Sequence, residues 1–503
     1  MEAVRHFGTN ARTTRGIIPA CHAADCRLSL SGFLRHFPRV PKPSDIRIRE
    51  VQLYFLPTTL RVPLKFGAQV VERALCARVR VTVEDRAGRT ATGWGETPLS
   101  VAWVWPSTLS WEEREARMVS FCKAIAAELP VLDLAGHPME LGDAFQRTRL
   151  DALLAEANSQ SPIRNPQSEM PHLAAMPHLA ALVCHSLFDL AVFDAFGNLL
   201  QRPVFETLGE EFLTADLAHF LDRDKRFAGL RPPHFLRPKQ VRIPVWHLVG
   251  GLDPLEDSDR TGSEPKDGYP VVLREWIRTD GLKCLKIKLR GTDAEWDYER
   301  IVRIGRIAIE EGCEWLTADF NCTVTDPAYV CEILDRLLPA APRIYGMLLY
   351  IEQPFPYDLE ANRIDVRSVS ARKPLFLDES AHDWRFVRLG RELGWTGVAL
   401  KTCKTLTGAL LSLCWARANG MTLMVQDLTN PMLAQIPHVT LAAHAGTIMG
   451  VESNGMQFCP EASLPEAKIH RGLYRRRDGV LDISTLGPTG FGYRVEEIAR
   501  VLP

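Results

Sequence analysis

Five short clusters between residues 286 and 404 decide the fold of this chain. They are KIK (286–288), ADFN (318–321), YIEQP (350–354), FLDES (376–380) and ALKTCK (399–404). Each follows a short apolar run, and a helix-like segment separates most neighbours. The clusters recur at intervals of roughly 23 to 33 residues, about the length of one strand-plus-helix unit in a parallel barrel. The spacing therefore predicts charged clusters at the ends of five consecutive parallel strands.

The order of charges in these clusters predicts a metal site between two amines. In an eight-stranded barrel the carboxyl ends of the strands share one rim, where active sites of this fold lie. Three carboxylates that converge there would repel one another unless a cation lay between them. Hard oxygen ligands in that number favour Mg²⁺. A lysine at each end of the series would then flank the bound substrate.

Composition indicates a globular protein of more than one domain. At 503 residues the chain exceeds the usual size of a single domain, and its hydrophobic content of 46% and charged content of 24% are ordinary. The formal net charge of −1 gives no electrostatic reason to expect nucleic acid or an anionic membrane as a partner. We find no apolar run of about 18 residues and so expect no membrane-spanning helix.

The 12 cysteines are dispersed along the chain, several of them inside predicted strands and helices. This pattern is typical of free thiols in a reducing cytoplasm, so we predict a cytoplasmic location. Cys21, His22 and Cys26 match no standard zinc spacing. Residues 1–45 are rich in arginine, poor in acid and lack the apolar core of a secretory signal. We expect a disordered leader or an overextended start; a transit peptide is the alternative.

Residues 46–180 predict an α+β capping domain. Alternating apolar and polar residues from Ile46 indicate half-buried strands, with a hairpin turn at Asp85-Arg86-Ala87-Gly88. A helix is predicted over residues 111–129. The near-repeat MPHLAA (170–175 and 176–181) is interpreted as part of an insertion.

Residues 181–478 predict a (β/α)-barrel, a modified TIM barrel. A helix is expected over 185–209, and insertions are expected near 210–240 and 253–268. The eight predicted strands lie near 241–249, 283–288, 315–319, 347–352, 374–378, 397–401, 421–426 and 447–452. Residues 479–503 form a tail that we expect to return to the cap.

The chain resembles the enolase superfamily, and within it the muconate lactonizing enzyme subgroup. That subgroup also includes dipeptide epimerases, N-acylamino acid racemases and o-succinylbenzoate synthases. The resemblance covers most of residues 46–493, including GWGE (93–96), FDLAVFDAFG (188–197) and the barrel clusters. It implies Mg²⁺-dependent removal of the proton α to a carboxylate, giving an enolate.

The resemblance also implies a role for each charged residue. Asp319, Glu352 and Asp378 would hold the metal, with Lys288 and Lys401 as acid and base on opposite faces of the substrate. A dication stabilises the developing enediolate charge where it forms, and a lysine base beside Mg²⁺ is a known pattern of this superfamily. The supporting residues would be Lys286, Asn321, Lys404 and Glu379.

A lysine base requires a lowered pKa. The ordinary value of about 10.4 should fall to about 7–8 for catalysis at neutral pH. We expect Lys286 to lower the pKa of Lys288 as a neighbouring like charge, and Lys404 to do the same for Lys401.

Candidate substrate contacts lie on the cap and on the last strands. Trp103 and Trp105 follow GWGE and would suit an apolar or aromatic substrate group, although packing between cap and barrel is an equal alternative. Asp427 and Glu452, at the ends of strands seven and eight, could contact substrate from the far side. LRVPLKFG (60–67) occupies the place of a mobile cap loop, with Gly67 as a hinge.

Some features depart from the family pattern. Leu406-Thr407-Gly408 replaces the usual double glycine, and the seventh strand, LMVQDLTNP, carries no rim histidine, which favours the lysine–lysine branch. We interpret His438 and His444 as packed or solvated helix residues.

The predicted function is that of a racemase or epimerase acting on a carboxylic acid or amino-acid derivative. The alternatives are a lyase of the same superfamily (a cycloisomerase, an o-succinylbenzoate synthase-like enzyme or an acid-sugar dehydratase), a Schiff-base aldolase and a non-catalytic relative. The expected partners are a small carboxylate substrate and further copies of the chain, with no nucleic acid and no membrane.

Overall fold

The computed structural model describes residues 41–66, 69–159 and 175–503, which belong to one compact unit spanning Pro41–Pro503. Most of the predicted leader, including Cys21, His22 and Cys26, lies outside the described residues. So do Gly67, the predicted hinge, and residues 160–174 of the first insertion.

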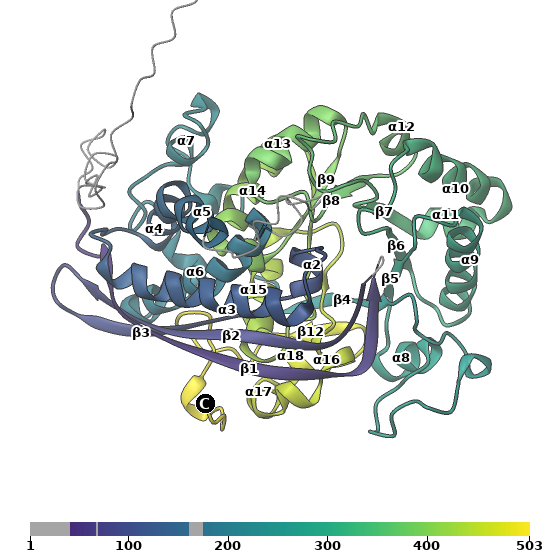
Figure 1. Cartoon of the computed structure of the whole chain (residues 1–503), viewed down its shortest axis with the longest axis horizontal. Coiled ribbons are helices and arrows are strands. Elements are labelled where there is room, and N and C mark those ends of the chain that lie inside the picture. The colour runs from purple at the N-terminus through teal and green to yellow at the C-terminus, as the bar shows by residue number, and fades with distance from the viewer. Residues whose placement is uncertain (1–40, 67–68, 160–174) are drawn as a thin grey trace, which may run out of the picture. The chain divides into compact units, whose positions relative to one another are not determined.

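The cap begins with a three-stranded antiparallel sheet (Figure 1). Its strands, in order, are β1 (Ile46–Phe66), β2 (Gln69–Asp85) and β3 (Thr90–Pro98). The predicted hairpin turn joins β2 to β3: Gly88 has φ 80°, and Asp85 Oδ1 accepts hydrogen bonds from the amides of Ala87 and Arg89. Since β3 is much shorter, the far end of the β1–β2 hairpin extends beyond it.

Helices cover the cap sheet. They are α2 (Val101–Val104), α3 (Trp111–Glu128), α4 (Pro138–Phe145), α5 (Asp151–Ser159) and α6 (His178–Leu200). The predicted helix α3 begins at Ser110, which forms a capping box with Glu113. The glycines of GWGE let α6 lie directly on β3, because a Cβ at Gly95 would stand 1.9 Å from the carbonyl oxygen of Leu187.

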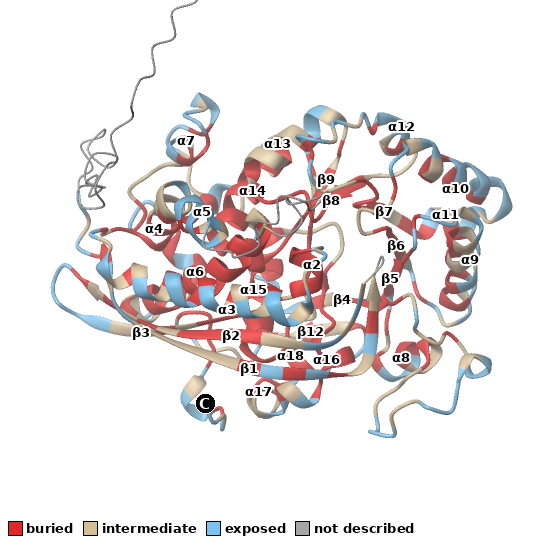
Figure 2. Ribbon diagram, viewed as in Figure 1, coloured by how far each residue is buried: buried red, intermediate tan, exposed pale blue. Residues whose placement is uncertain are grey.

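Helix α6 is the core of the cap. It is long and apolar enough to cross a membrane by length and composition, contrary to our expectation, but its apolar window is 100% buried inside the protein. Figure 2 shows it buried along nearly its whole length, whereas α3 exposes one face. Because α6 packs on β2 and β3, we propose that the cap extends to Leu200 and not only to residue 180.

Eight parallel strands form a nearly closed barrel in the order β10-β9-β8-β7-β6-β5-β4-β11 (Figure 1). They are β4 (Arg242–Val249), β5 (Cys284–Lys288), β6 (Trp315–Asp319), β7 (Leu348–Glu352), β8 (Leu375–Leu377), β9 (Gly397–Leu400), β10 (Thr422–Val425) and β11 (Val451–Glu452). Each lies where the sequence predicts a strand. The amide of Ile448 donates to the carbonyl of Leu423 at 2.8 Å and links the two ends of the sheet.

Helices surround the barrel. The longer ones are α8 (Leu273–Asp280), α9 (Ala294–Glu310), α10 (Pro327–Ala340), α11 (Pro342–Met347), α13 (Trp384–Leu393), α14 (Leu406–Ala418) and α15 (Gln435–Ala445). The predicted insertions carry only short helical turns, among them α7 (Leu217–Phe220) and a single turn at Asp257–Asp259. The second insertion reaches the cap, where Asp267 forms a two-bond ion pair with Arg61 of β1 at 2.6 and 2.9 Å.

An apolar floor inside the barrel orients the polar rim. It consists of Trp246, Cys284, Tyr350, Phe376 and Met424, all buried, and the rings of Tyr350 and Phe376 stack with centroids 4.1 Å apart. Side chains alternate along a strand, so residues two positions further on also point into the barrel. Those residues are Leu248, Lys286, Glu352, Asp378 and Gln426.

The C-terminal tail joins the barrel before it reaches the cap. Strand β12 (Val480–Asp482) pairs antiparallel with β4. Farther along, the amide of Phe491 donates to Asp194 of α6 at 2.8 Å, and the carbonyl of Gly490 accepts from Val204 at 2.9 Å. We propose that the expected return to the cap is made around residues 489–491, through Asn198 and Asp194 of α6, and not by the strand.

Candidate active site

The predicted lysines and carboxylates meet at the carboxyl end of the barrel. Asp319 and Glu352 end β6 and β7, while Asp378 and Lys401 directly follow β8 and β9. Lys288 ends β5, four strands from β9 in a barrel of eight, so Lys288 and Lys401 approach from opposite sides. All five side chains are at most 8% exposed.

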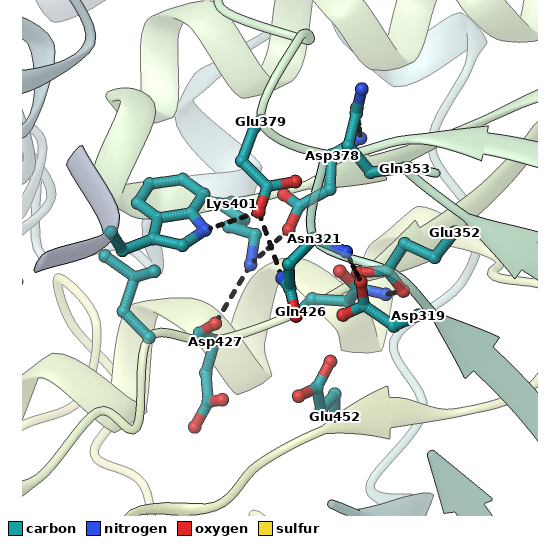
Figure 3. Close-up of polar contacts among 12 residues, drawn as sticks. Asp319, Asn321, Glu352, Gln353, Asp378, Glu379, Lys401, Gln426, Asp427 and Glu452 are labelled. Atoms are coloured by element: carbon teal, nitrogen blue, oxygen red, sulfur yellow. Dashed lines mark hydrogen bonds and ion pairs between the residues drawn. The ribbon is translucent and has the colours of Figure 1, made fainter. Parts of the chain in front are cut away.

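Lysines lie among these carboxylates. Lys286 Nζ stands 2.6 Å from Glu352 Oε1, 2.9 Å from Glu452 Oε2 and 3.1 Å from Asp319 Oδ2. Lys288 Nζ lies 2.5 Å from the same oxygen of Asp319. On the other side, Lys401 Nζ lies 3.1 Å from Asp378 Oδ2 (Figure 3). These pairs supply a counter-ion to Asp319, Glu352, Asp378 and Glu452.

The donor set nevertheless fits a hard divalent cation. Among the residues that the structure describes, no three His, Cys, Asp or Glu side chains already stand as a formed metal site, because ammonium groups occupy the space between the acids. Asp378 Oδ1 is buried without a hydrogen-bond partner. Burial raises the pKa of Glu352, and the neighbouring charges of Asp319 and Asp378 raise it further. Such crowded carboxylate oxygens match the chemistry of Mg²⁺.

Comparison with known proteins agrees with this arrangement. Residues 271–499 match the family model described as enolase C-terminal domain-like. Residues 271–499 therefore belong to this family. An aromatic dipeptide epimerase from Herpetosiphon aurantiacus is 25% identical over 212 residues, which are 41% of this chain and 56% of that protein. The chain thus aligns with little more than half the length of this curated relative.

Solved structures of the superfamily share the whole fold. A dipeptide epimerase from Enterococcus faecalis, complexed with Mg and the dipeptide L-Leu-L-Tyr, has a TM-score of 0.56 and 16% identity, covering 89% of this chain and 99% of that one. A muconate lactonizing enzyme from Pseudomonas fluorescens has a TM-score of 0.56 and 16% identity, covering 91% and 99%. The predicted resemblance to the enolase superfamily and the predicted barrel with an N-terminal cap are confirmed. The relatives named here are enzymes, which agrees with the predicted enzyme.

The pKa values of the lysines in this site differ from our expectation. Burial is the largest single effect and lowers the pKa of Lys401, but Asp378, Glu452 and Cys403 raise it, and the net pKa is raised. The pKa of Lys286 is also raised, since Glu352, Glu452 and Asp319 outweigh burial. The pKa of Lys404 is lowered, because burial lowers it and Lys401 lowers it further. The expectation of a lowered pKa for Lys401 is therefore wrong for the protein without metal. The neighbouring acids raise this pKa more than burial and the neighbouring cation lower it.

Asn321 and Glu379 connect the two sides of the rim. Lys288 donates to Asn321 Oδ1 at 3.1 Å. Asn321 Nδ2 donates to Glu379 Oε1 at 3.1 Å (Figure 3). The indole N–H of Trp103 donates to the same oxygen at 3.0 Å. Both residues therefore touch the predicted site as supporting groups.

Two glutamines of the site escaped the sequence reasoning. Gln426 donates to Glu352 Oε2 at 2.5 Å, and Gln353 Oε1 accepts from the amide of Asp378 at 2.8 Å. Gln353 also has the unusual φ of 30°. Their positions in the sequence could have identified them. Gln353 directly follows the end of β7, and Gln426 lies two residues beyond Met424 of the barrel floor.

Asp427 and Glu452 line the pocket but are largely engaged by neighbours. The Asp427 carboxylate accepts from the amides of Asn430 and Asn454, and its carbonyl accepts from Lys401 at 3.1 Å. Glu452 Oε1 accepts from Asn454 Nδ2 at 2.7 Å, and its other oxygen pairs with Lys286. Asp427 thus shapes the rim loop, whereas Glu452 presents a charge to the pocket.

The cap closes the pocket with apolar side chains. The cavity, of about 70 Å³, contains Lys288 and Lys401 in its walls. Its apolar cap wall consists of Leu60, Leu64, Phe66, Val71, Trp103 and Trp111. The Phe66 ring centroid lies 5.9 Å from Lys288 Nζ, and the Trp103 ring centroid lies 4.9 Å from Lys401 Nζ. Each amine therefore has an aromatic ring of the cap beside it.

Trp105 does not face this pocket and is corrected as a substrate-contact candidate. It is 1% exposed and belongs to the hydrophobic core of the cap. The two helix histidines are packed, as interpreted: His438 is fully buried with Nε2 2.6 Å from the carbonyl of Glu452, and His444 stacks on Phe205.

The departure at residues 406–408 also has a structural reason. Thr407 donates its amide and its hydroxyl to the buried Asp189 of α6 at 3.0 and 2.7 Å. A glycine at this position would lack the hydroxyl donor. The bond joins the cap helix to the segment that carries Lys401 and Lys404.

Proposed function

We propose that the protein is a racemase or epimerase that removes the proton α to a substrate carboxylate and returns it on the opposite face. The observation that carries the proposal is that Lys288 and Lys401 line one pocket from strands β5 and β9, four positions apart in a ring of eight. Inversion at carbon requires an acid and a base on opposite faces, and this spacing supports it. The dipeptide epimerases among its relatives support the same reaction.

Lys288 and Lys401 act as base and acid in the proton transfer. The neutral amine of one lysine takes the proton, and the ammonium of the other returns a proton from the far side; the roles exchange for the opposite epimer. Lys288 is oriented by Asp319 and Asn321, and Lys401 is oriented by Asp378 and the carbonyl of Asp427. The aromatic rings of the cap exclude water from both amines.

Asp319, Glu352 and Asp378 would hold the metal. When bound there, Mg²⁺ supplies Lewis-acid stabilisation of the negative charge that develops on the substrate carboxylate. It would also offset the field of the acids that raises the pKa of Lys401.

We propose a dipeptide or an N-substituted amino acid with an apolar or aromatic side chain as the substrate. The apolar cap wall supports this class, and Glu452 offers a carboxylate to a cationic group at the other end of such a molecule.

The test is exchange of the α-hydrogen with deuterated water. The full chain is incubated with Mg²⁺ and a panel of dipeptides and N-succinyl amino acids, and ¹H NMR follows the α signal and the formation of the other epimer. Exchange with inversion supports the proposal. A product that has lost a β-leaving group or formed a ring would instead indicate the lyase or cycloisomerase alternative, and trapping by borohydride would indicate a Schiff base.

Other sequence predictions stay predictions. All cysteines in the described part of the chain are free, which supports a reducing cytoplasm. A homo-oligomeric state is proposed on the resemblance alone, and sedimentation velocity would test it.

A further inference from the structure

We infer that Trp103, a residue of the cap, is a positioning residue for Lys288 and acts through Glu379 and Asn321. The inference rests on the proposed function, in which Lys288 exchanges the proton on one face of the substrate. Trp103 then has a defined task in the reaction in addition to forming part of the pocket wall.

A continuous hydrogen-bonded path joins the two residues. The indole N–H of Trp103 donates to Glu379 Oε1 at 3.0 Å, and Asn321 Nδ2 donates to the same oxygen at 3.1 Å. The other end of the Asn321 amide, Oδ1, accepts from Lys288 Nζ at 3.1 Å. Figure 3 shows the Asn321 amide directed at Glu379.

The path determines which way the Asn321 amide faces. Glu379 Oε1 holds the amino end of the amide, so the carbonyl end must face Lys288. A flipped amide would direct an N–H at the ammonium group and its oxygen at the carboxylate, losing both bonds. The backbone of Asn321 adds rigidity, because its φ is 47° and its amide donates to Asp319 Oδ1 at 2.9 Å.

Burial makes the indole N–H hard to replace. Trp103 is 8% exposed and Glu379 5% exposed. Water has little access to the carboxylate if the indole N–H is removed, so Glu379 loses a hydrogen bond that holds its oxygen in place. The Asn321 amide then turns more freely, and Lys288 with it.

The same side chain meets the other lysine through a different part. The Trp103 ring centroid lies 4.9 Å from Lys401 Nζ and 5.5 Å from Lys404 Nζ. The indole N–H is thus linked to Lys288 through Glu379 and Asn321, whereas the ring itself lies beside Lys401. Trp103→Phe removes the N–H and retains an aromatic ring, which separates the two contributions.

The experiment measures exchange from each epimer of one substrate separately, with the full chain and Mg²⁺ in deuterated water. Lys288→Ala first identifies the epimer whose α-proton is taken by Lys288. Trp103→Phe should slow exchange of that epimer at least tenfold more than exchange of the other, with the larger change in kcat. Asn321→Ala should reproduce the asymmetry.

Trp105→Phe is the matched control. Trp105 belongs to the same cap segment and is buried, but its indole nitrogen has no hydrogen-bond partner among the residues that the structure describes. Its exchange rates for both epimers should stay at the wild-type values. An equal loss for both epimers in Trp103→Phe, or a change in KM alone, would reduce Trp103 to a wall residue and overturn the inference.

A second measurement does not depend on activity. In protein labelled with ¹⁵N-tryptophan, the indole resonance absent from Trp103→Phe identifies Trp103, and that resonance should shift in Glu379→Ala but not in Trp105→Phe. An unmoved resonance refutes the hydrogen-bonded path even if the enzyme epimerises. If the wild-type protein exchanges the α-hydrogen of no substrate, but the Trp103 resonance shifts in Glu379→Ala, the proposed function is refuted and the hydrogen-bonded path is not.

Discussion

Replacement of Lys286 by methionine should weaken the protein without metal and enlarge its response to Mg²⁺. Lys286 Nζ lies within 3.1 Å of oxygens of Asp319, Glu352 and Glu452, and all of these groups are buried. Methionine keeps most of the volume of the side chain and removes the charge. Three buried carboxylates then share fewer counter-ions.

The magnitude follows from the burial of these pairs. Breaking a buried ion pair by removing one partner costs about 3–5 kcal/mol. One kcal/mol shifts the Tm of a domain of 150–250 residues by about 2–4 °C, and a larger chain shifts less, so we expect a loss of roughly 5–10 °C in EDTA. Mg²⁺ bound by Asp319 and Glu352 would restore part of the missing positive charge, so the gain in Tm on adding Mg²⁺ should be larger in the variant than in the wild type.

Differential scanning fluorimetry with EDTA and with excess Mg²⁺ measures both quantities. Lys283→Met is the control, because Lys283 directly precedes β5 but is exposed, and in the described part of the chain its ammonium donates only to the carbonyl of Gly312. Its Tm should match the wild type under both conditions. An equal Mg²⁺ response in the wild type and in Lys286→Met would refute the reasoning that Lys286 and the metal compensate the same carboxylates.

Three further predictions follow from the fold and the site. Lys288→Ala and Lys401→Ala should each lower the epimerisation rate by at least about 10²–10⁴-fold, as removal of an acid or base does, and normal turnover by both would contradict the proposed roles. Arg61→Ala removes the ion pair with Asp267 that ties the hairpin to the second insertion, so steady-state kinetics should show a raised KM with a smaller change in kcat. Burial raises the pKa of Asp194 to about 7, above its value near 3.9 when unfolded, so the folded state binds more protons between these values and stability falls as pH rises from about 4 to 7. Asp194→Asn should flatten that slope in Tm measured from pH 4 to 8, and an unchanged slope would assign it to other groups.

The sequence by itself determined the barrel and the identity of the rim residues. Each strand is a short apolar run that ends in a polar residue, and this pattern is local, so it can be read without knowledge of distant parts of the chain. The regular spacing then places Asp319, Glu352 and Asp378 on neighbouring strands, because consecutive strand-helix units of a parallel barrel lie side by side. The hairpin turn at Asp85–Gly88 was predictable for the same local reason.

Only the tertiary structure decided how these groups meet. Lys286 pairs with Glu352 and Glu452, which are 66 and 166 residues away, and Trp103 bonds to Glu379 across 276 residues. Such contacts depend on how the cap lies on the barrel and on which rotamers the packing permits. For the same reason local pattern could not tell Trp103 from Trp105, nor foresee that Asp378 raises the pKa of Lys401, because electrostatic effects depend on distances between side chains and on burial.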